Sequence, residues 1–308
     1  MAIGHISKVS RFGIQRKMVA EMTSQSWKNI PHVSYIYDPD VTNFIEAYKE
    51  FNASLPEGKH VTLNTVILKA ICEALKAAPQ MNAHIRFEKR LVRGKITQFE
   101  NIDVSMPWIL PDGSMMTITM TDMGNRSLGN MTEYMAETAK KLEKTNLTQA
   151  MYSVSMNDTM EELRKGKFIS VAFRLIGSKT QKRHRVTPLT GEAKKQYDAI
   201  PDEEKITKKD LKQGTITISN IGSITRGIEG SIAMLMVIPP QICAIGISAV
   251  QKKPVVKADE NGNDVVATAS VLPLNICFDH RALDFGDIKP FLVKLDDIFD
   301  HPEQIFVY

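Results

Sequence analysis

A histidine and an aspartate four residues apart follow an apolar segment near the end of the chain. Residues 272–278 (LPLNICF) predict a buried strand, and this strand leads directly into Asp279, His280 and Asp284. An imidazole is partly neutral at physiological pH, so it can take a proton from a thiol or a hydroxyl. We therefore expect His280 to act as a general base and Asp284 to have a structural role that maintains the local conformation around it.

Two other interpretations of these residues stay open. His280 could simply end the strand, and Asp284 could cap the helix that follows. A metal pair formed by Asp279 and His280 is disfavoured, because adjacent residues of an extended strand point to opposite faces. The sequence also offers no further cysteine or histidine nearby at the spacing of metal ligands.

A second candidate lies in residues 214–222 (GTITISNIG), which alternate like a strand and end in Ser219, Asn220 and Gly222. A serine hydroxyl at this place could donate a hydrogen bond to an oxyanion, and Gly222 would allow an unusual backbone turn. The same residues are also ordinary turn formers, so the segment alone does not define a site.

The spacing of apolar residues and of helix breakers predicts the elements that must position these side chains. Helices are expected at residues 16–27, from Asp40 or Thr42 to 52, from Asn64 or Thr65 to before 79, at 128–142 and at 287–299. Strands are expected at 32–37, in three runs between 83 and 121 with turns at Arg93-Gly94 and 111–113, and in the last third around a turn at 260–263. Strands mixed with helices imply a layered α/β or α+β fold.

Residues from about 146 to 209 are mainly polar, with an apolar run at 168–176 and a basic patch at 179–185 (KTQKRHR). We interpret this region as an elaboration on the core. The basic patch could meet the phosphates of a ligand or an acidic protein domain, although a run of charges is more often a solvated face.

Composition narrows the class of protein. The 308 residues suffice for one large α/β domain or two closely packed ones, and a formal net charge of +4 is too small to predict a nucleic-acid partner. The three cysteines, Cys72, Cys243 and Cys277, are an odd number in apolar runs, which indicates buried free thiols in a reducing compartment.

No membrane partner is expected. Residues 231–250 carry no charge and approach the length of a membrane span, but Pro239, Pro240 and Gln241 interrupt them, so we expect two buried segments around a turn. The start of the chain lacks the apolar core of a secretory signal, and we expect a cytoplasmic protein.

These segments, taken in order, resemble the catalytic domains of the dihydrolipoamide acyltransferases of 2-oxo acid dehydrogenase complexes, which are related to chloramphenicol acetyltransferase. The resemblance is carried by residues 16–34, 63–83, the DVS and PDG segments at 103–105 and 111–113, 215–223, 239–256, 272–288 and 295–306. It implies one acyltransferase domain over residues 1–308, with a two-layer mixed sheet and helices packed on it. The region at about 146–209 would be an insertion, and lipoyl and peripheral-subunit-binding domains would be absent.

The resemblance also implies roles for single residues. His280 would remove the proton from the attacking thiol of coenzyme A or dihydrolipoamide, and Ser219 would hydrogen-bond the oxyanion. Asp284 would have a structural role and pair with Arg16, and Asn220 and Gly222 would support the serine. The reaction would use acyl-CoA as substrate and no metal, with the lipoyl group on a separate carrier.

In this family the site lies between subunits, so the resemblance implies a homotrimer and possible larger assemblies with dehydrogenase-complex subunits. Residues 304–308 could join trimers or tuck into their own subunit. Two alternatives remain: a stand-alone acetyltransferase of a small hydroxyl or amine compound, and a non-catalytic oligomeric core. The chain departs from the family at Phe285, inserted before Gly286, and in the strands at 101–110 and 115–120.

Overall fold

The computed structural model describes residues 5–10, 12–110, 113, 115–154, 188–224 and 228–308. Its described residues form two compact units. The first combines residues up to 24 with residues from 139 to 211, and the second combines 25–138 with 212–308. Two helices cross from one unit to the other along the chain, α1 (Ile14–Asn29) and α4 (Leu128–Glu143).

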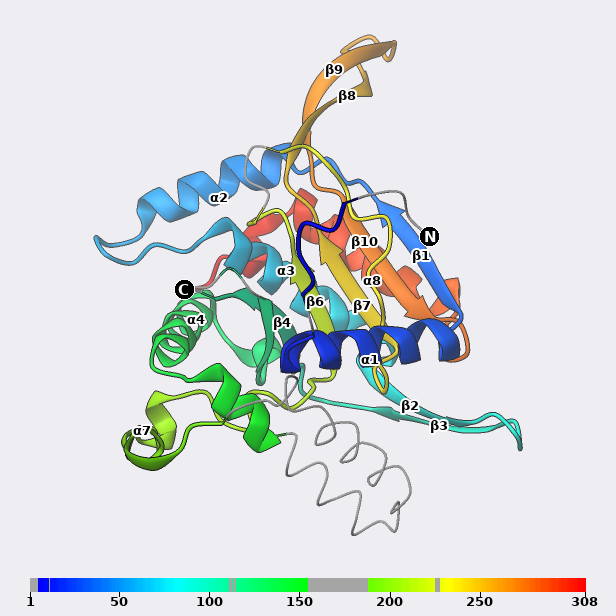
Figure 1. Ribbon diagram of the computed structural model, residues 1–308. Helices are drawn as coiled ribbons and strands as arrows, with labels where there is room; N and C mark the ends of the chain where they lie inside the picture. Colours follow the sequence, from blue (N-terminus) through cyan, green and yellow to red (C-terminus); the bar gives the residue numbers. More distant parts are fainter. Residues whose placement is uncertain (1–4, 11, 111–112, 114, 155–187, 225–227) are drawn as a thin grey trace. The chain divides into compact units, whose positions relative to one another are not determined.

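The second unit contains a mixed six-stranded sheet in the order β1-β10-β7-β6-β4-β5 (Figure 1). β6 runs parallel to β4 and β7, and the remaining neighbours are antiparallel. The strands are β1 (His32–Tyr37), β4 (Val104–Ile109), β5 (Met115–Met120), β6 (Ile216–Asn220), β7 (Cys243–Ile247) and β10 (Leu274–Asp279). The mixed sheet with packed helices that the sequence predicts is confirmed.

One face of this sheet is covered by α3 (Leu63–Ala77) and α8 (Phe285–Asp300), which lie behind the strands in Figure 1. α2 (Thr42–Ser54) adds Phe44 to the same core. Alternate residues of β10, such as Ile276 and Phe278, enter this core, whereas Cys277 joins a smaller cluster with Ile30 and Val237. Because both faces of β10 are covered, all six of its residues are buried, including the polar Asn275 and Asp279.

The second face carries the irregular chain of residues 228–238. Buried Asn275 fixes this chain through its side chain, which donates to Ala233 O (3.0 Å) and accepts from Leu235 N (2.9 Å). The expected turn at Pro239-Pro240 is present, and Gln241 to Ser248 are buried as predicted. The expectation of a buried segment before the turn is wrong, since residues 231–236 are irregular and at least partly exposed. Among the described residues, no helix combines the length and apolar character of a membrane span.

Two antiparallel hairpins extend from the sheet as arms (Figure 1). One is β2 (Ala83–Glu88) with β3 (Arg93–Gln98), and the other is β8 (Gln251–Ala258) with β9 (Asp264–Val271). The turn expected at Arg93-Gly94 is instead formed by residues 89–92, and both predicted turn residues belong to β3. Val92 takes the left-handed backbone conformation at this turn (φ 48°).

Two expected helix caps differ from those in the structure. Thr62, rather than Asn64 or Thr65, caps α3 by accepting from Thr65 N (3.2 Å). Val41 stands at the cap position of α2, although Asp40 does accept from the backbone of Thr42 (3.0 Å).

The C-terminal residues fold back onto their own unit, after the short helix η5 (Pro302–Ile305). Phe306 stacks on Phe51 with ring centroids 4.8 Å apart, and Val307 O accepts from Leu128 N (3.1 Å). The ring of Tyr308 packs so closely over Gly129 that a side chain there would come within 2.8 Å of it. Of the two alternatives for residues 304–308, this packing favours the tail tucked into its own subunit.

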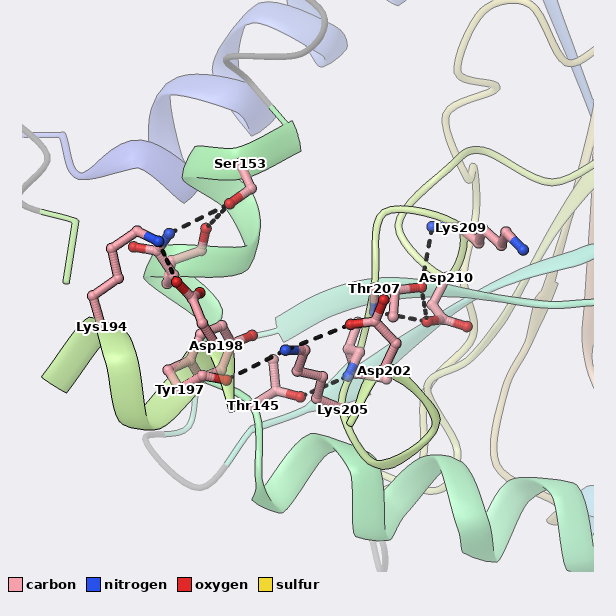
Figure 2. A network of polar contacts seen from close by, with 12 residues as sticks. Thr145, Ser153, Lys194, Tyr197, Asp198, Asp202, Lys205, Thr207, Lys209 and Asp210 are labelled. Atoms are coloured by element: carbon pink, nitrogen blue, oxygen red, sulfur yellow. Dashed lines mark hydrogen bonds and ion pairs between the residues drawn. The ribbon is translucent and has the colours of Figure 1, made fainter. Parts of the chain in front are cut away.

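The first unit holds the described parts of the expected insertion, 146–154 and 188–209, including α7 (Gly191–Asp198). Polar contacts organise it (Figure 2): Lys205 donates to Tyr197 O (3.3 Å), and Thr145 accepts from the backbone of Ile206 (2.8 Å). The apolar run at 168–176 and the basic patch at 179–185 lie outside the described residues.

Candidate active site

His280 stands directly beyond the last residue of β10, with its backbone N–H donating to Pro31 O (3.0 Å). Its ring is about half exposed, with 48% of the side chain accessible. Nδ1 lies 3.1 Å from Leu283 O and 3.2 Å from Asp284 Oδ1. A carbonyl oxygen only accepts, so this geometry assigns the hydrogen to Nδ1 and leaves the lone pair of a neutral ring on Nε2. A neutral ring with a free lone pair is what a general base requires.

Asp284 serves two local purposes at once. It is the N-cap of α8 and forms a capping box with Asp287, whose carboxylate accepts from Asp284 N (2.8 Å). The same Asp284 carboxylate faces His280 Nδ1. The sequence left helix capping and support of a base as alternatives, and the structure makes them compatible.

A buried ion pair beneath His280 escaped the sequence interpretation. Asp279 is fully buried, and Arg281 donates to it through Nε (2.9 Å) and Nη2 (2.6 Å). The hydrogen bonds to Asp279 raise the pKa of Arg281. Asp279 also accepts from Arg281 N (3.0 Å), so its carboxylate fixes the turn that carries His280. A charged residue at the end of a buried strand needs a partner, and Arg281 was the nearest cation in the sequence.

The inserted Phe285 belongs to a row of aromatic rings that reaches His280. Its ring meets Tyr35 and Phe278 edge-on, each with centroids 5.7 Å apart. Phe278 in turn contacts the ring of His280 edge-on, at 5.9 Å and 88°. Phe285 is therefore accommodated at the first position of α8, where it remains half exposed.

Ser219 lies near the end of β6 and is buried, opposite Gly246 of β7. Its hydroxyl makes no hydrogen bond with any residue that the structure describes. Since Ile216 and Ile218 enter the core under α3 and α8, alternation places Ser219 on the other face of the sheet. Among the described residues, the hydroxyl is thus an unused donor.

Asn220 and Gly222 shape the chain after Ser219. The Asn220 side chain donates to Asn64 Oδ1 (2.5 Å) and accepts from Ser223 N (3.0 Å). Gly222 does lie in a turn, at residues 222–224, but its backbone is not in the left-handed region. A Cβ there would lie 2.6 Å from Ala249 N, so glycine permits a close approach of two backbones.

Ser219 and His280 are not brought together within one chain. Ser219 and Asn275 both stand opposite Gly246, and β10 then carries His280 five residues further along its length. At about 3.3 Å per residue, the two site residues are separated by roughly 16 Å along the strand direction. Arg16 lies in the part of α1 that belongs to the first unit, whereas Asp284 belongs to the second.

None of the three cysteines is suited to be a nucleophile. All are free and buried, as the sequence predicts. Burial raises the pKa of Cys72 to about 12 and that of Cys277 to about 11, and it also raises the pKa of Cys243. Thiols in such surroundings stay protonated and unreactive. The described residues contain no cluster of three or more His, Cys, Asp or Glu that could hold a metal ion.

The chain is similar to proteins of known function over most of its length. It is 23% identical to the dihydrolipoyllysine-residue acetyltransferase component of the pyruvate dehydrogenase complex of Mycobacterium bovis, over 95% of this chain and 40% of the relative. The Zymomonas mobilis component is 21% identical over 93% of this chain and 48% of its own length. The chain thus spans about half or less of the length of these curated relatives.

Solved structures share the fold. The dihydrolipoamide acetyltransferase of Azotobacter vinelandii, studied for the roles of a serine, a histidine and an asparagine in its mechanism, superposes with a TM-score of 0.63 at 19% identity, covering 99% of this chain and 96% of that one. The cubic core of a pyruvate dehydrogenase complex gives 0.64 at 18% identity, with the same coverage. The model of the 2-oxoacid dehydrogenases acyltransferase catalytic domain matches residues 5–155 and 182–307. The chain therefore belongs to the family of 2-oxoacid dehydrogenase acyltransferase catalytic domains.

Proposed function

We propose that this chain moves an acyl group between coenzyme A and a dihydrolipoyl thiol on a separate carrier. The observation that carries the proposal is the geometry of His280, whose Nδ1 is held by Leu283 O so that Nε2 offers its lone pair. The names of the curated relatives give the same chemistry for those proteins. Three buried free thiols fit a reducing compartment such as the cytoplasm.

The reaction follows from these groups. His280 Nε2 takes the proton of the attacking thiol, and the thiolate adds to the carbonyl carbon of the thioester. Ser219 donates a hydrogen bond to the resulting oxyanion. When the tetrahedral intermediate collapses, the departing thiolate takes the proton back from His280. One thiol and one thioester are consumed, and one of each is formed, so His280 ends unprotonated. The reaction is therefore nearly balanced in free energy and needs positioning of the reactants more than a driving force.

Asp284 and the Asp279–Arg281 pair have positioning roles in this proposal. Asp284 supports the Nδ1 side of the ring, and the buried pair fixes the turn between β10 and α8. A pairing of Arg16 with Asp284 remains part of the proposal.

A site shared between copies of the chain completes the proposal. The roughly 16 Å between Ser219 and His280 along the sheet is too long for one carbonyl group to meet both. A homotrimer in which each copy gives its histidine to one site and its serine to the next would reconcile the two. Larger assemblies of such trimers fit the cubic core with which the chain shares its fold.

The test is turnover. The purified chain is incubated with acetyl-CoA and dihydrolipoamide, and free coenzyme A is followed against a His280→Ala variant of equal secondary structure. Turnover above that variant is expected. If alcohols or amines are acetylated and dihydrolipoamide is not, the chain is a small-molecule acetyltransferase. If no acceptor gives turnover above His280→Ala, the enzyme proposal fails.

A further inference from the structure

The β2–β3 arm carries an excess of positive charge. Residues 86–98 are all exposed, and they include five cations against one acid, Glu88. The cations are Arg86, Lys89, Arg90, Arg93 and Lys95. None of them forms an ion pair with a residue that the structure describes.

The strand register sets one pair of like charges against each other, although Glu88 and Arg93, also opposed, have opposite charges. Arg86 stands directly opposite Lys95 in the hairpin register. Like charges at directly opposed positions destabilise a strand pair. The hairpin therefore keeps a repulsive pair that a single acidic residue would relieve.

The second arm shows that such charge is not general to the hairpins of this protein. β8–β9 and its turn contain three lysines and three acids. Lys253 and Lys257 pair with Asp38 and Asp40, each at 2.7 Å. The β8–β9 arm is balanced and partly neutralised by the body of the protein, so the excess is particular to β2–β3.

Apolar side chains accompany the charges. Leu91 and Val92 at the turn are 62% and 79% exposed, and Ile96 is 45% exposed. Val92 is a β-branched residue in the left-handed region, which asparagine or glycine would occupy with less strain. Cations together with exposed apolar residues form a surface suited to another protein rather than to solvent alone.

The β2–β3 arm lies beside the turn that carries His280, the candidate general base. Ile85 N donates to Pro240 O (2.8 Å), and the guanidinium of Arg281 lies over the ring of Phe87 (5.2 Å). Arg281 is the residue after His280 and is held by Asp279. A protein that docks on the arm would therefore lie next to His280.

We propose that the β2–β3 arm docks the acidic protein domain that carries the dihydrolipoyl group to His280. This rests on the proposed function. The five cations of the arm favour an acidic surface and speed its diffusional approach, and Leu91, Val92 and Ile96 supply the apolar contact. The formal net charge of the whole chain is only +4, which fits a protein patch better than a nucleic-acid surface.

The experiment compares two charge-reversal variants of the full chain. Arg90→Glu/Arg93→Glu changes the arm, and Lys49→Glu/Lys140→Glu makes the same change of charge on exposed helical positions of α2 and α4. The probe is a purified lipoyl domain of net negative charge, in its reduced form. Its kcat/KM with acetyl-CoA is measured at low and high salt, beside that of free dihydrolipoamide.

For the arm variant we expect kcat/KM with the lipoyl domain to fall about tenfold at low salt and the salt dependence to flatten. Free dihydrolipoamide and the KM for acetyl-CoA should keep their values, and the control variant should behave as the unmodified chain. The proposal is overturned if the arm variant loses as much kcat/KM with free dihydrolipoamide as with the lipoyl domain. It is also overturned by a raised KM for acetyl-CoA, which would place coenzyme A phosphates on the arm. A changed assembly size would overturn it too, because it would place a second copy of the chain there.

Direct binding of the lipoyl domain, followed by titration calorimetry, separates docking from catalysis. If the unmodified chain turns over no dihydrolipoamide, the proposed function fails, yet docking is still judged by this titration. If the unmodified chain and the arm variant bind the lipoyl domain equally, the docking proposal fails.

Discussion

At the scale of single residues, most of the contacts that hold the candidate base lie within the eight residues from Asp279 to Gly286. Asp279 and Arg281 neutralise each other, His280 is held through Nδ1, and Asp284 caps α8. These neighbours are close in sequence, so the sequence could predict His280 and Asp284. The Asp279–Arg281 pair was missed although Arg281 is the nearest cation, because the full burial of the Asp279 carboxylate depends on elements far along the chain.

Replacing Asp284 separates its two functions. The carboxamide of an asparagine can still accept at the helix start and face Nδ1, so Asp284→Asn should keep most activity. Asp284→Ala should lose about 1 kcal/mol of stability and a large part of kcat. Urea unfolding and the acyltransfer assay measure both. Equal activity of the Ala and Asn variants would contradict a positioning role.

Removing Arg281 should destabilise the fold. Arg281→Met leaves a buried carboxylate without its partner, and we expect a loss of about 3 kcal/mol in the free energy of unfolding. Lys49→Met on the exposed face of α2 is the control and should change stability little. Thermal unfolding followed by circular dichroism decides the matter, and an unchanged midpoint for Arg281→Met would refute the argument.

At the scale of elements, the backbone approach at Gly222 sets a sharp test. Gly222→Ala places a Cβ 2.6 Å from Ala249 N, which should cost about 1–3 kcal/mol through forced displacement. Gly286→Ala in α8 meets nothing within 4 Å and should be neutral or slightly stabilising. A chemical denaturation series of both variants compares the two. If the two variants are equally stable, the backbone after β6 and the backbone after β7 have room for a side chain between them.

The lysine pair around Glu73 gives α3 a pH dependence. Burial alone would raise the pKa of Glu73, but hydrogen bonds from Lys69 and Lys76 together lower it. A carboxyl whose pKa is lower in the folded state stabilises the fold at pH values above its pKa in the unfolded chain. This contribution to stability is lost as the pH falls through the acid range. Glu73→Gln should therefore be less stable at neutral pH and equal to the unmodified chain in acid, as unfolding curves at each pH would reveal.

Much of the element pattern could be predicted because it is local. The limits of β1 were predicted correctly, and α8, predicted at 287–299, spans Phe285–Asp300. The turn at Arg93-Gly94 was misplaced because glycine is a strong turn signal, whereas the chain turns at Val92 instead. Thr62 was missed as a cap because Asn64 and Thr65 are equally good candidates by type. The role of Gly222 depends on Ala249, which no local pattern gives.

At the scale of the whole molecule, strand order decides how the site can be built. The order β10-β7-β6, with β10 antiparallel to β7, sets His280 and Ser219 apart, and the sequence does not give that order. A mixture of Ser219→Ala and His280→Ala chains tests the shared site. If copies exchange, roughly a quarter of the sites regain both residues. Co-expression should then restore activity well above either variant alone, and no recovery would contradict sharing.

If the separation of Ser219 from His280 along the sheet means a shared site, as proposed, the protein should respond to dilution in a particular way. A site divided between copies exists only while the copies are associated, so the rate per chain becomes a function of total protein concentration. A lone copy would hold a base without an oxyanion donor, and dilution followed by a time-dependent loss of rate would report the lifetime of the assembly. Catalytic output would thus be set by association as much as by chemistry.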